Sequence, residues 1–279
     1  MKFNRIMQGD GRPVLMLHDL GGSWRTLEKV RDLVASNREV IVIDIPGFGS
    51  TPKLKGEVTI SRLADEIIEY IKENNLVGAD AFGISLGGNI ILEILRRGNI
   101  FGKVVVASPI GFAEGKEKRK FYFPLITLIC IVRICKYYLP RLAGKPEKKR
   151  FLIKSLSYFP TEIYNIIVLS YFFDLLMSKS YSKVLWQMSY GEQQAGIAKG
   201  TIEDKLLIIW GRKDKLIKQN QIDRIHENFP DAKLEIIEDS GHYIHWDQPK
   251  ELVKSIKNFL TNDEDTPDIV YPDKIIIKI

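Results

Sequence analysis

Short apolar runs alternate with longer segments of helical periodicity along both flanks of the chain. Six runs rich in Val, Ile and Leu have the length of strands: residues 13–18, 39–45, 79–84, 103–108, 205–210 and 233–238. Such continuous runs are typical of strands buried on both faces of a parallel sheet. Five helix-period segments accompany them: Trp24–Ser36, Ile60–Asn75, Leu86–Arg97, Gln219–Asn228 and Pro249–Leu260. The alternation predicts a doubly wound, mostly parallel α/β sheet with helices on both faces.

The middle of the chain interrupts this alternation. Residues 112–199 contain 15 Lys and Arg against 6 Asp and Glu, and they hold 16 of the 28 aromatic residues. Their helical segments lie between two predicted strands. We therefore expect a core domain of residues 1–111 and 200–261, a helical cap insertion of residues 112–199, and a C-terminal tail of residues 262–279. The tail ends in KIIIKI, which suits either an edge strand or a partner-binding segment.

The cap contains a run of twelve residues without a charge, Phe121–Val132. It is shorter than the ~20 residues that span a bilayer, so it predicts a buried cap helix. The alternative is a weak contact with a membrane surface, next to the basic segment Lys116–Lys120. Basic and aromatic composition also occurs in nucleic-acid-binding proteins, but no recognition motif accompanies it here, so we expect no nucleic-acid partner.

Targeting and metal-binding signals are missing from the sequence. The N-terminal segment has no apolar stretch followed by a cleavage site, which predicts a cytoplasmic protein. Cys130 and Cys135 are five residues apart, a spacing that fits neither a redox motif nor a zinc pair, and they are expected to be small buried hydrophobes. The four histidines form no metal-binding motif, and no phosphate-binding loop is present, so we expect neither a metal nor a cofactor.

A serine lies where the predicted strand at 79–84 meets a helical segment. Residues 83–87 read Gly-Ile-Ser-Leu-Gly, the G-x-S-x-G spacing of a nucleophile elbow. In such an elbow the Ser85 backbone adopts a strained turn, and Gly83 and Gly87 leave space that a Cβ would fill. The alternative for this motif alone is a glycine-rich turn without chemistry.

A serine hydroxyl needs a base and a group that orients the base. Asp214 follows the strand predicted at 205–210, and His242 follows the strand predicted at 233–238. The order Ser85, Asp214, His242 is the order expected on this kind of sheet. Singly, Asp214 fits a surface turn and His242 a loop histidine. Together they predict a triad in which His242 removes the Ser85 proton and Asp214 orients the imidazole.

An acyl transfer also needs donors for the developing oxyanion. The segment LMLHDLGGS places a glycine-rich turn after the first apolar run. We expect the backbone N–H groups of Leu20 and Leu86 to form the oxyanion hole. The same turn also fits a simple helix start with Ser23 as its cap.

Several segments together resemble the α/β-hydrolase superfamily, in its cap-bearing serine hydrolase branch: HDLGGS, DIPGFGST, GISLGG, GRKD and SGHYIHWDQP. The resemblance implies an eight-stranded sheet, the triad roles given above, and a structural role for Asp44. The family usually has His-Gly where this chain has His18-Asp19, and a carboxylate near an oxyanion opposes the reaction unless it points away. Ile84 occupies a position that is often polar in esterases.

The expected function is that of a serine hydrolase with an acyl-enzyme intermediate, similar to carboxylesterases and lipases. Its partner would be a small-molecule ester with an apolar or amphiphilic chain, because the cap is aromatic and basic. A serine at the elbow argues against the relatives that use an aspartate nucleophile. Hydrolysis of a carbon–carbon bond in a diketone-type substrate is the first alternative. A non-catalytic binding module on the same scaffold is the second. The oligomeric state is not predicted.

Overall fold

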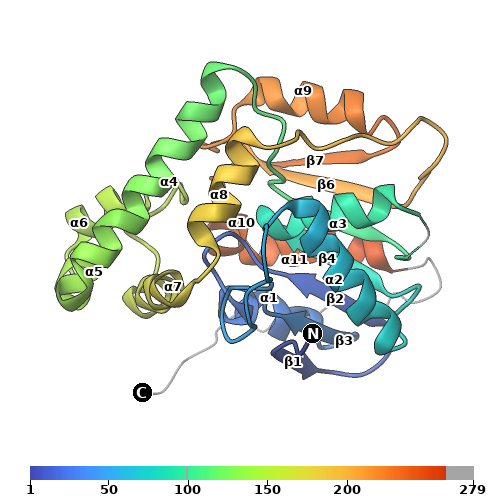
Figure 1. Cartoon of the computed structure of the whole chain (residues 1–279), viewed down its shortest axis with the longest axis horizontal. Helices are drawn as coiled ribbons and strands as arrows, with labels where there is room; N and C mark the ends of the chain where they lie inside the picture. Colours follow the sequence, from blue (N-terminus) through green and yellow to red (C-terminus); the bar gives the residue numbers. More distant parts are fainter. Residues whose placement is uncertain (99, 262–279) are drawn as a thin grey trace.

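A computed structural model describes residues 1–98 and 100–261, and in this part of the chain seven strands form one sheet. The strands are β1 (Arg5–Gln8), β2 (Pro13–Leu17), β3 (Glu39–Ile43), β4 (Asp80–Ile84), β5 (Val104–Ala107), β6 (Leu206–Gly211) and β7 (Lys233–Ile237). Their order is β1-β3-β2-β4-β5-β6-β7, and all neighbours are parallel except β1 and β3. Figure 1 shows this sheet with helices on both sides.

Helices cover both faces because successive strand residues point in opposite directions. Val14 and Met16 of β2 pack with the 3-10 helix η1 (Trp24–Leu27), α1 (Glu28–Val34) and α11 (Pro249–Leu260). Leu15 and Leu17 of β2 belong to the opposite core, with α2 (Ile60–Glu73), α3 (Leu86–Arg96) and α9 (Gln219–Asn228). This arrangement confirms the predicted doubly wound α/β class.

The strand count differs from the eight strands that the family resemblance implied. Each of the six predicted runs is a strand, and its ends agree within two residues. The run at 233–238 differs from the prediction in burial, because only one of the five β7 residues is buried. The seventh strand, β1, was not predicted, because three of its four side chains are exposed and it has no apolar run. An eighth strand does not occur among the described residues. The C-terminal tail of residues 262–279 lies outside them, so its role stays undecided.

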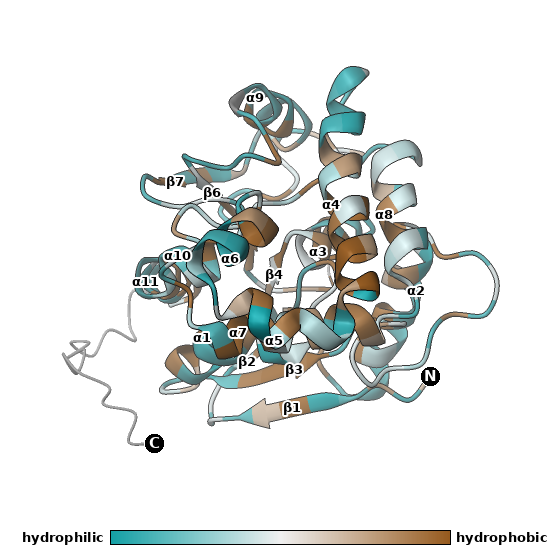
Figure 2. Ribbon diagram, turned by 90° about the vertical axis from the view of Figure 1, so that its left-hand side faces the viewer, coloured by the Kyte–Doolittle hydropathy of each residue, from teal (hydrophilic) through white to brown (hydrophobic). Residues whose placement is uncertain are grey.

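Five α-helices lie between β5 and β6. They are α4 (Lys116–Ile134), α5 (Leu139–Ala143), α6 (Pro146–Ile153), α7 (Asn165–Met177) and α8 (Tyr181–Tyr190), with the 3-10 helix η2 (Lys136–Tyr138) after α4. They project from one side of the sheet (Figure 1). The apolar run Phe121–Val132 lies entirely within α4, whose first turns are hydrophilic and whose remainder is mainly hydrophobic (Figure 2).

The outer face of α4 also contains apolar residues, and this overturns one expectation. Cys130 is exposed and Cys135 half-buried, so the prediction that both are buried hydrophobes was wrong. Among the described helices, none alone has the length and apolar content to cross a membrane. Residues 116–134 and 136–143 reach that threshold only as a pair bent by 80°.

Candidate active site

Ser85 lies on a strained turn between β4 and α3. Its backbone has φ 53° and ψ −114°, a region that residues with a Cβ rarely adopt. A Cβ on residue 83 would lie 2.6 Å from the Gly87 backbone, and a Cβ on residue 87 would lie 2.2 Å from the Leu17 carbonyl oxygen. Only glycine therefore fits on either side, and the turn places the Ser85 hydroxyl at the carboxyl edge of the sheet.

The structure brings the side chains of Ser85, His242 and Asp214 together from three separate loops. The Nε2 atom of His242 lies 3.0 Å from the Ser85 Oγ, and its Nδ1 atom lies 2.8 Å from an Asp214 carboxylate oxygen. The other Asp214 oxygen accepts hydrogen bonds from the Leu216 and Ile217 backbone N–H groups, at 2.8 and 3.0 Å. These bonds fix the carboxylate, since each of its oxygens has a defined partner.

This geometry selects one tautomer of the imidazole. An ionised carboxylate only accepts hydrogen bonds, so the Nδ1–H group of His242 is the hydrogen-bond donor to Asp214. Nε2 is then the acceptor for the Ser85 hydroxyl. The side chains of His242 and Asp214 are only 2% and 1% exposed, so the chain of hydrogen bonds is shielded from water. The arrangement can transfer a proton from the serine to the histidine.

The predicted oxyanion donors lie beside this group. Leu20 follows β2 and Leu86 begins α3, and the two segments are joined because the Gly87 N–H donates to the His18 carbonyl, at 3.1 Å. Leu20 and Leu86 are buried. Neither backbone N–H donates to any acceptor in residues 1–98 and 100–261. Unpaired buried donors are rare in folded proteins, so both are available for an anionic ligand atom.

The Asp19 carboxylate is occupied by other groups. One oxygen accepts the Thr26 hydroxyl, at 2.8 Å, and the other accepts the Tyr243 hydroxyl. Tyr171 of α7 lies 3.1 Å from that hydroxyl and donates to the Leu20 carbonyl, at 3.3 Å. Burial raises the pKa of Tyr171 and of Tyr243 well above the ordinary value, so both remain donors. This network satisfies the unusual Asp19 and holds the loop that contains Leu20.

Sequence reasoning missed the two tyrosines. Tyr243 was adjacent to a predicted site residue, and that neighbourhood was the only available signal. Tyr171 belongs to α7 of the cap and lies 151 residues after Leu20 along the chain. No pattern in the sequence connects two positions so far apart.

Two further polar residues support the surrounding loops. His18 accepts the Ile45 N–H at Nε2, at 3.0 Å, and its Nδ1 lies 2.8 Å from the Asp19 carbonyl oxygen. Asp44 is fully buried and accepts the backbone N–H groups of Trp24 and Ser50, at 2.8 and 2.9 Å. Both side chains have their hydrogen bonds within the loops, which suits a structural role.

His245 differs from His242 although it is only three residues away. It is buried, and neither of its ring nitrogens has a partner in the described part of the chain. Burial lowers the pKa of His245 to about 4. The imidazole is therefore neutral near pH 7, and it is not positioned to exchange a proton with Ser85. No group of three or more His, Cys, Asp or Glu residues in the described ranges is arranged to hold a metal ion.

Cap side chains cover the loop after β2. A Cβ on Gly21 would lie 2.6 Å from the Leu175 side chain and 3.0 Å from the Tyr181 ring, so α7 and α8 pack directly on this loop. Asp174 of α7 accepts the Ser23 hydroxyl, at 2.6 Å, and burial raises the pKa of Asp174. Ser85 itself is 3% exposed. Ser85 is therefore shielded from bulk water, and apolar and aromatic groups of the cap pack on the loop after β2.

Comparison with known proteins identifies the setting of this site. Residues 14–255 match the model of the alpha/beta hydrolase family. The uncharacterized hydrolase YugF of Bacillus subtilis is 22% identical over 259 residues, which cover 91% of this chain and 92% of YugF.

Solved structures of low sequence identity share the fold. A thermophilic esterase from Thermogutta terrifontis has a TM-score of 0.70 and 17% identity, and the match covers 92% of each chain. A meta-cleavage product hydrolase from Pseudomonas fluorescens IP01 also has a TM-score of 0.70 and 17% identity, covering 92% of this chain and 93% of that one.

Proposed function

Because the chain belongs to the alpha/beta hydrolase family, we propose that it is a serine hydrolase that cleaves an ester through an acyl-enzyme intermediate. The observation that supports this most is the continuous hydrogen-bonded path from the Ser85 hydroxyl through His242 to Asp214. The structural relatives include an esterase and a meta-cleavage product hydrolase, which represents the carbon–carbon bond alternative.

In the first step, the Ser85 Oγ attacks the ester carbonyl carbon while its proton moves to Nε2 of His242. The carbonyl oxygen becomes an oxyanion and accepts the Leu20 and Leu86 N–H groups. One such donor is typically worth ~100–1000-fold in turnover. The imidazolium, stabilised by Asp214, then gives the proton to the departing alkoxide. The products of this step are an alcohol and an acylated Ser85.

In the second step, water replaces the alcohol. His242 takes a proton from the water, whose oxygen attacks the acyl carbon, and a second oxyanion forms in the same place. Collapse of this intermediate expels the Ser85 oxygen, which recovers its proton from the imidazolium. The acid is released and the enzyme is regenerated. Every proton in the cycle passes through Nε2, the atom that faces Ser85.

The alternative, cleavage of a carbon–carbon bond in a diketone, uses the same residues. A basic pocket would favour it, because the expected substrate of that alternative is a dicarboxylate. The buried cations of the described residues all have partners away from Ser85. Arg31 contacts Asp32, Arg38 contacts Asp80, Lys149 contacts the Ile163 carbonyl, and Lys257 contacts the Ser36 hydroxyl. The absence of a free buried cation in the described ranges favours an uncharged, apolar acyl group and therefore an ester.

A substrate panel tests the proposal. We expect p-nitrophenyl esters of graded chain length to be hydrolysed, with Ser85→Ala reducing kcat by about 10⁴-fold or more. The panel should include a vinylogous diketone that reports carbon–carbon cleavage. Faster turnover of the diketone than of every ester would replace the ester assignment by its alternative. Undiminished ester turnover in Ser85→Ala would refute the serine mechanism altogether.

A further inference from the structure

Exposed hydrophobic side chains are concentrated on the cap. Among the described residues, 15 large hydrophobic side chains are exposed, and 11 of them lie within residues 112–199. The α/β core is roughly twice as long and exposes only four. A single exposed hydrophobe needs no explanation, whereas such a concentration marks an interaction surface.

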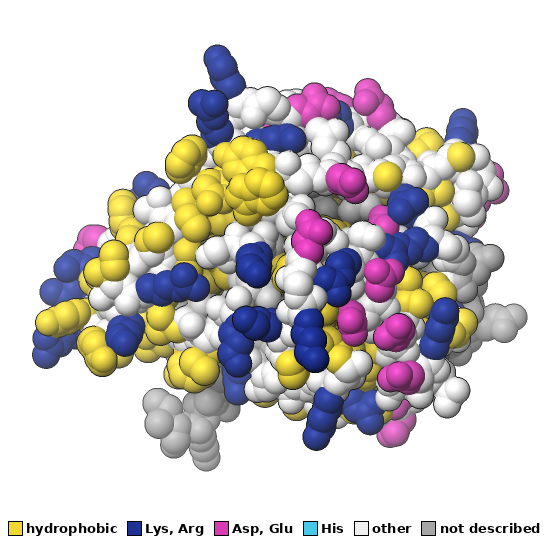
Figure 3. Space-filling view, in the orientation of Figure 1, with side chains coloured by type: hydrophobic (Ala, Val, Ile, Leu, Met, Phe, Trp, Pro, Cys, Tyr) yellow, Lys and Arg dark blue, Asp and Glu magenta, His cyan; other side chains and the backbone are white. Residues whose placement is uncertain are grey.

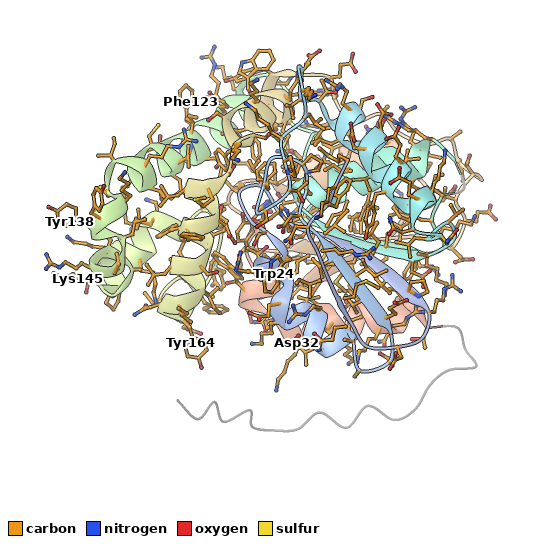
Figure 4. All side chains as sticks on the ribbon, turned by 60° about the horizontal axis from the view of Figure 1, so that its bottom comes forward. Trp24, Asp32, Phe123, Tyr138, Lys145 and Tyr164 are labelled. Atoms are coloured by element: carbon orange, nitrogen blue, oxygen red, sulfur yellow. The ribbon has the colours of Figure 1, made fainter. Side chains whose placement is uncertain are left out.

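Five aromatic residues on this surface form a connected strip. Tyr122 lies 5.7 Å from Phe123 and 5.4 Å from Tyr190, and Trp186 lies 6.2 Å from Tyr190, measured between ring centroids. A groove of about 600 Å³ between α4 and α6 extends the strip from Phe123 to Phe151. Phe123, Phe151 and Trp186 are 56%, 60% and 51% exposed. We call the five residues the aromatic strip: Tyr122, Phe123, Phe151, Trp186 and Tyr190. Phe123 lies at the outer edge of the cap in Figure 4.

Basic side chains outnumber acidic ones around the strip, although Glu57, Glu93 and Glu192 line a cavity beside Trp186. Residues 118–190 contain 13 Lys and Arg against 3 Asp and Glu, and one of those three acids, Asp174, is buried against Ser23. Arg119 and Lys120 lie in the turn of α4 that precedes Tyr122. Lys154 has its Nζ atom 5.2 Å from the centroid of the Phe151 ring. On the face shown in Figure 3, hydrophobic and basic side chains cover the cap, while most acidic side chains lie over the core.

We propose that the aromatic strip docks on the surface of an anionic lipid bilayer. Tyr and Trp place an apolar ring and a polar tip at the boundary between lipid and water. Lysines beside them keep their charge at the headgroups while their methylene groups cover apolar surface. Aromatic residues are enriched at protein interfaces as well, but Lys is depleted from them, so the lysines beside the strip favour a lipid surface over another protein. Anionic headgroups complement the charge of this face directly.

The inner face of α4 argues that the helix lies on the membrane and does not cross it. Phe121, Leu125, Leu128 and Val132 are buried against the rest of the protein, so only the opposite face is free for lipid. An interfacial helix buries one face by about 5–10 Å at the headgroup boundary, which this arrangement permits. The proposal concerns binding and does not depend on the proposed hydrolase activity.

Vesicle co-sedimentation of the full chain tests this proposal. We expect binding to vesicles of 30% phosphatidylglycerol in phosphatidylcholine, with little binding to pure phosphatidylcholine. The variant Phe123→Ser/Trp186→Ser should weaken the partition coefficient about tenfold, because two half-exposed rings are removed. Arg119→Gln/Lys120→Gln should weaken it about twentyfold, and 0.5 M salt should have a similar effect. The control is Val77→Ser, since Val77 is 56% exposed, like Phe123, but lies in the core domain.

Three outcomes would overturn the proposal. They are equal binding to both vesicle types, unchanged binding of the Phe123→Ser/Trp186→Ser variant, and a dimer in light scattering that this variant dissociates while no vesicles are bound. Circular dichroism should show that each variant is folded. Ser85→Ala should bind vesicles like the wild type, so a failed hydrolase proposal and a failed docking proposal give different results.

Discussion

Residue by residue, the candidate site depends on a few side chains whose surroundings decide their chemistry. His242 and His245 belong to one short segment, yet only His242 has partners on both ring nitrogens. Ser85 has a positive φ, which costs on the order of 1–3 kcal/mol and is characteristic of residues held in place for function. The strained backbone of Ser85 and the hydrogen bonds of His242 distinguish these proposed reacting groups from their neighbours.

The buried His245 makes the stability of the protein depend on pH. Its pKa is lowered from 6.5 to about 4 in the folded state. As the pH falls below 6.5, the unfolded chain binds a proton that the folded protein does not, so the free energy of unfolding decreases until the pH nears 4. At pH 5 this loss is about 2 kcal/mol relative to pH 7.

Urea unfolding at pH 7 and pH 5 measures this effect in the variant His245→Leu. We expect the variant to lose about 2 kcal/mol less than the wild type between the two pH values. The matched control is His226→Leu, because His226 is exposed on α9. Equal pH dependence in the wild type and in His245→Leu would contradict this account.

The site positions could be predicted from the sequence where the backbone itself determines them. Ser85, Asp214 and His242 each follow a strand of the sheet, and parallel strands bring their carboxyl ends to one edge of the sheet. The partners of Asp19 could not be predicted in this way. The Asp19 carboxylate accepts the hydroxyl groups of Thr26 and Tyr243, and the Tyr243 hydroxyl in turn contacts Tyr171 of the cap. The contact with Tyr171 depends on how the cap packs on the loop after β2.

Between elements, cap helix α7 is hydrogen-bonded to the loop after β2. The Tyr171 hydroxyl donates to the carbonyl oxygen of Leu20, whose own N–H is a proposed oxyanion donor. Tyr171 is therefore a positioning residue: it acts through the loop and has no proposed contact with the reacting atoms. Loss of its hydroxyl should loosen the loop without removing any reacting group.

We expect Tyr171→Phe to lower kcat about fivefold and to leave KM nearly unchanged, since a buried hydrogen bond is worth about 1 kcal/mol. Steady-state kinetics with the best ester of the panel provides the measurement. Tyr70→Phe is the matched control, because Tyr70 is a buried tyrosine of α2 whose hydroxyl accepts from Arg5 at 3.3 Å, in the core domain. An equal loss of kcat in both variants, or a change confined to KM, would refute a positioning role.

The central strands were predictable because their apolar runs are continuous and buried, and core helices such as α2 because their burial is periodic, whereas the cap helices were not. On α4 the inner positions are apolar, but the outer positions Phe123, Cys130 and Ile134 are apolar and exposed as well. On α7, Val168 and Leu175 are buried while Ile166 and Phe173 are exposed. A helix that is apolar on both faces has no amphipathic pattern, so its bounds and its inward face cannot be read from the sequence.

In the whole molecule, the cap has two faces with different surroundings. Its inner face packs on the loop after β2, where Leu175 and Tyr181 lie against Gly21. Its outer face presents the aromatic strip and most of the excess positive charge. An amphiphile at a membrane surface would meet the outer face first. The two proposals thus describe opposite sides of the same helices, although each has its own test.

The central claim is that Ser85 is an activated nucleophile, and covalent labelling tests it most directly. The folded protein is incubated with a fluorophosphonate probe, digested, and mapped by mass spectrometry. We predict one adduct, on the peptide that contains Ser85, absent from Ser85→Ala and strongly reduced in His242→Ala. An unlabelled folded protein, or an adduct that persists in Ser85→Ala, would contradict the account.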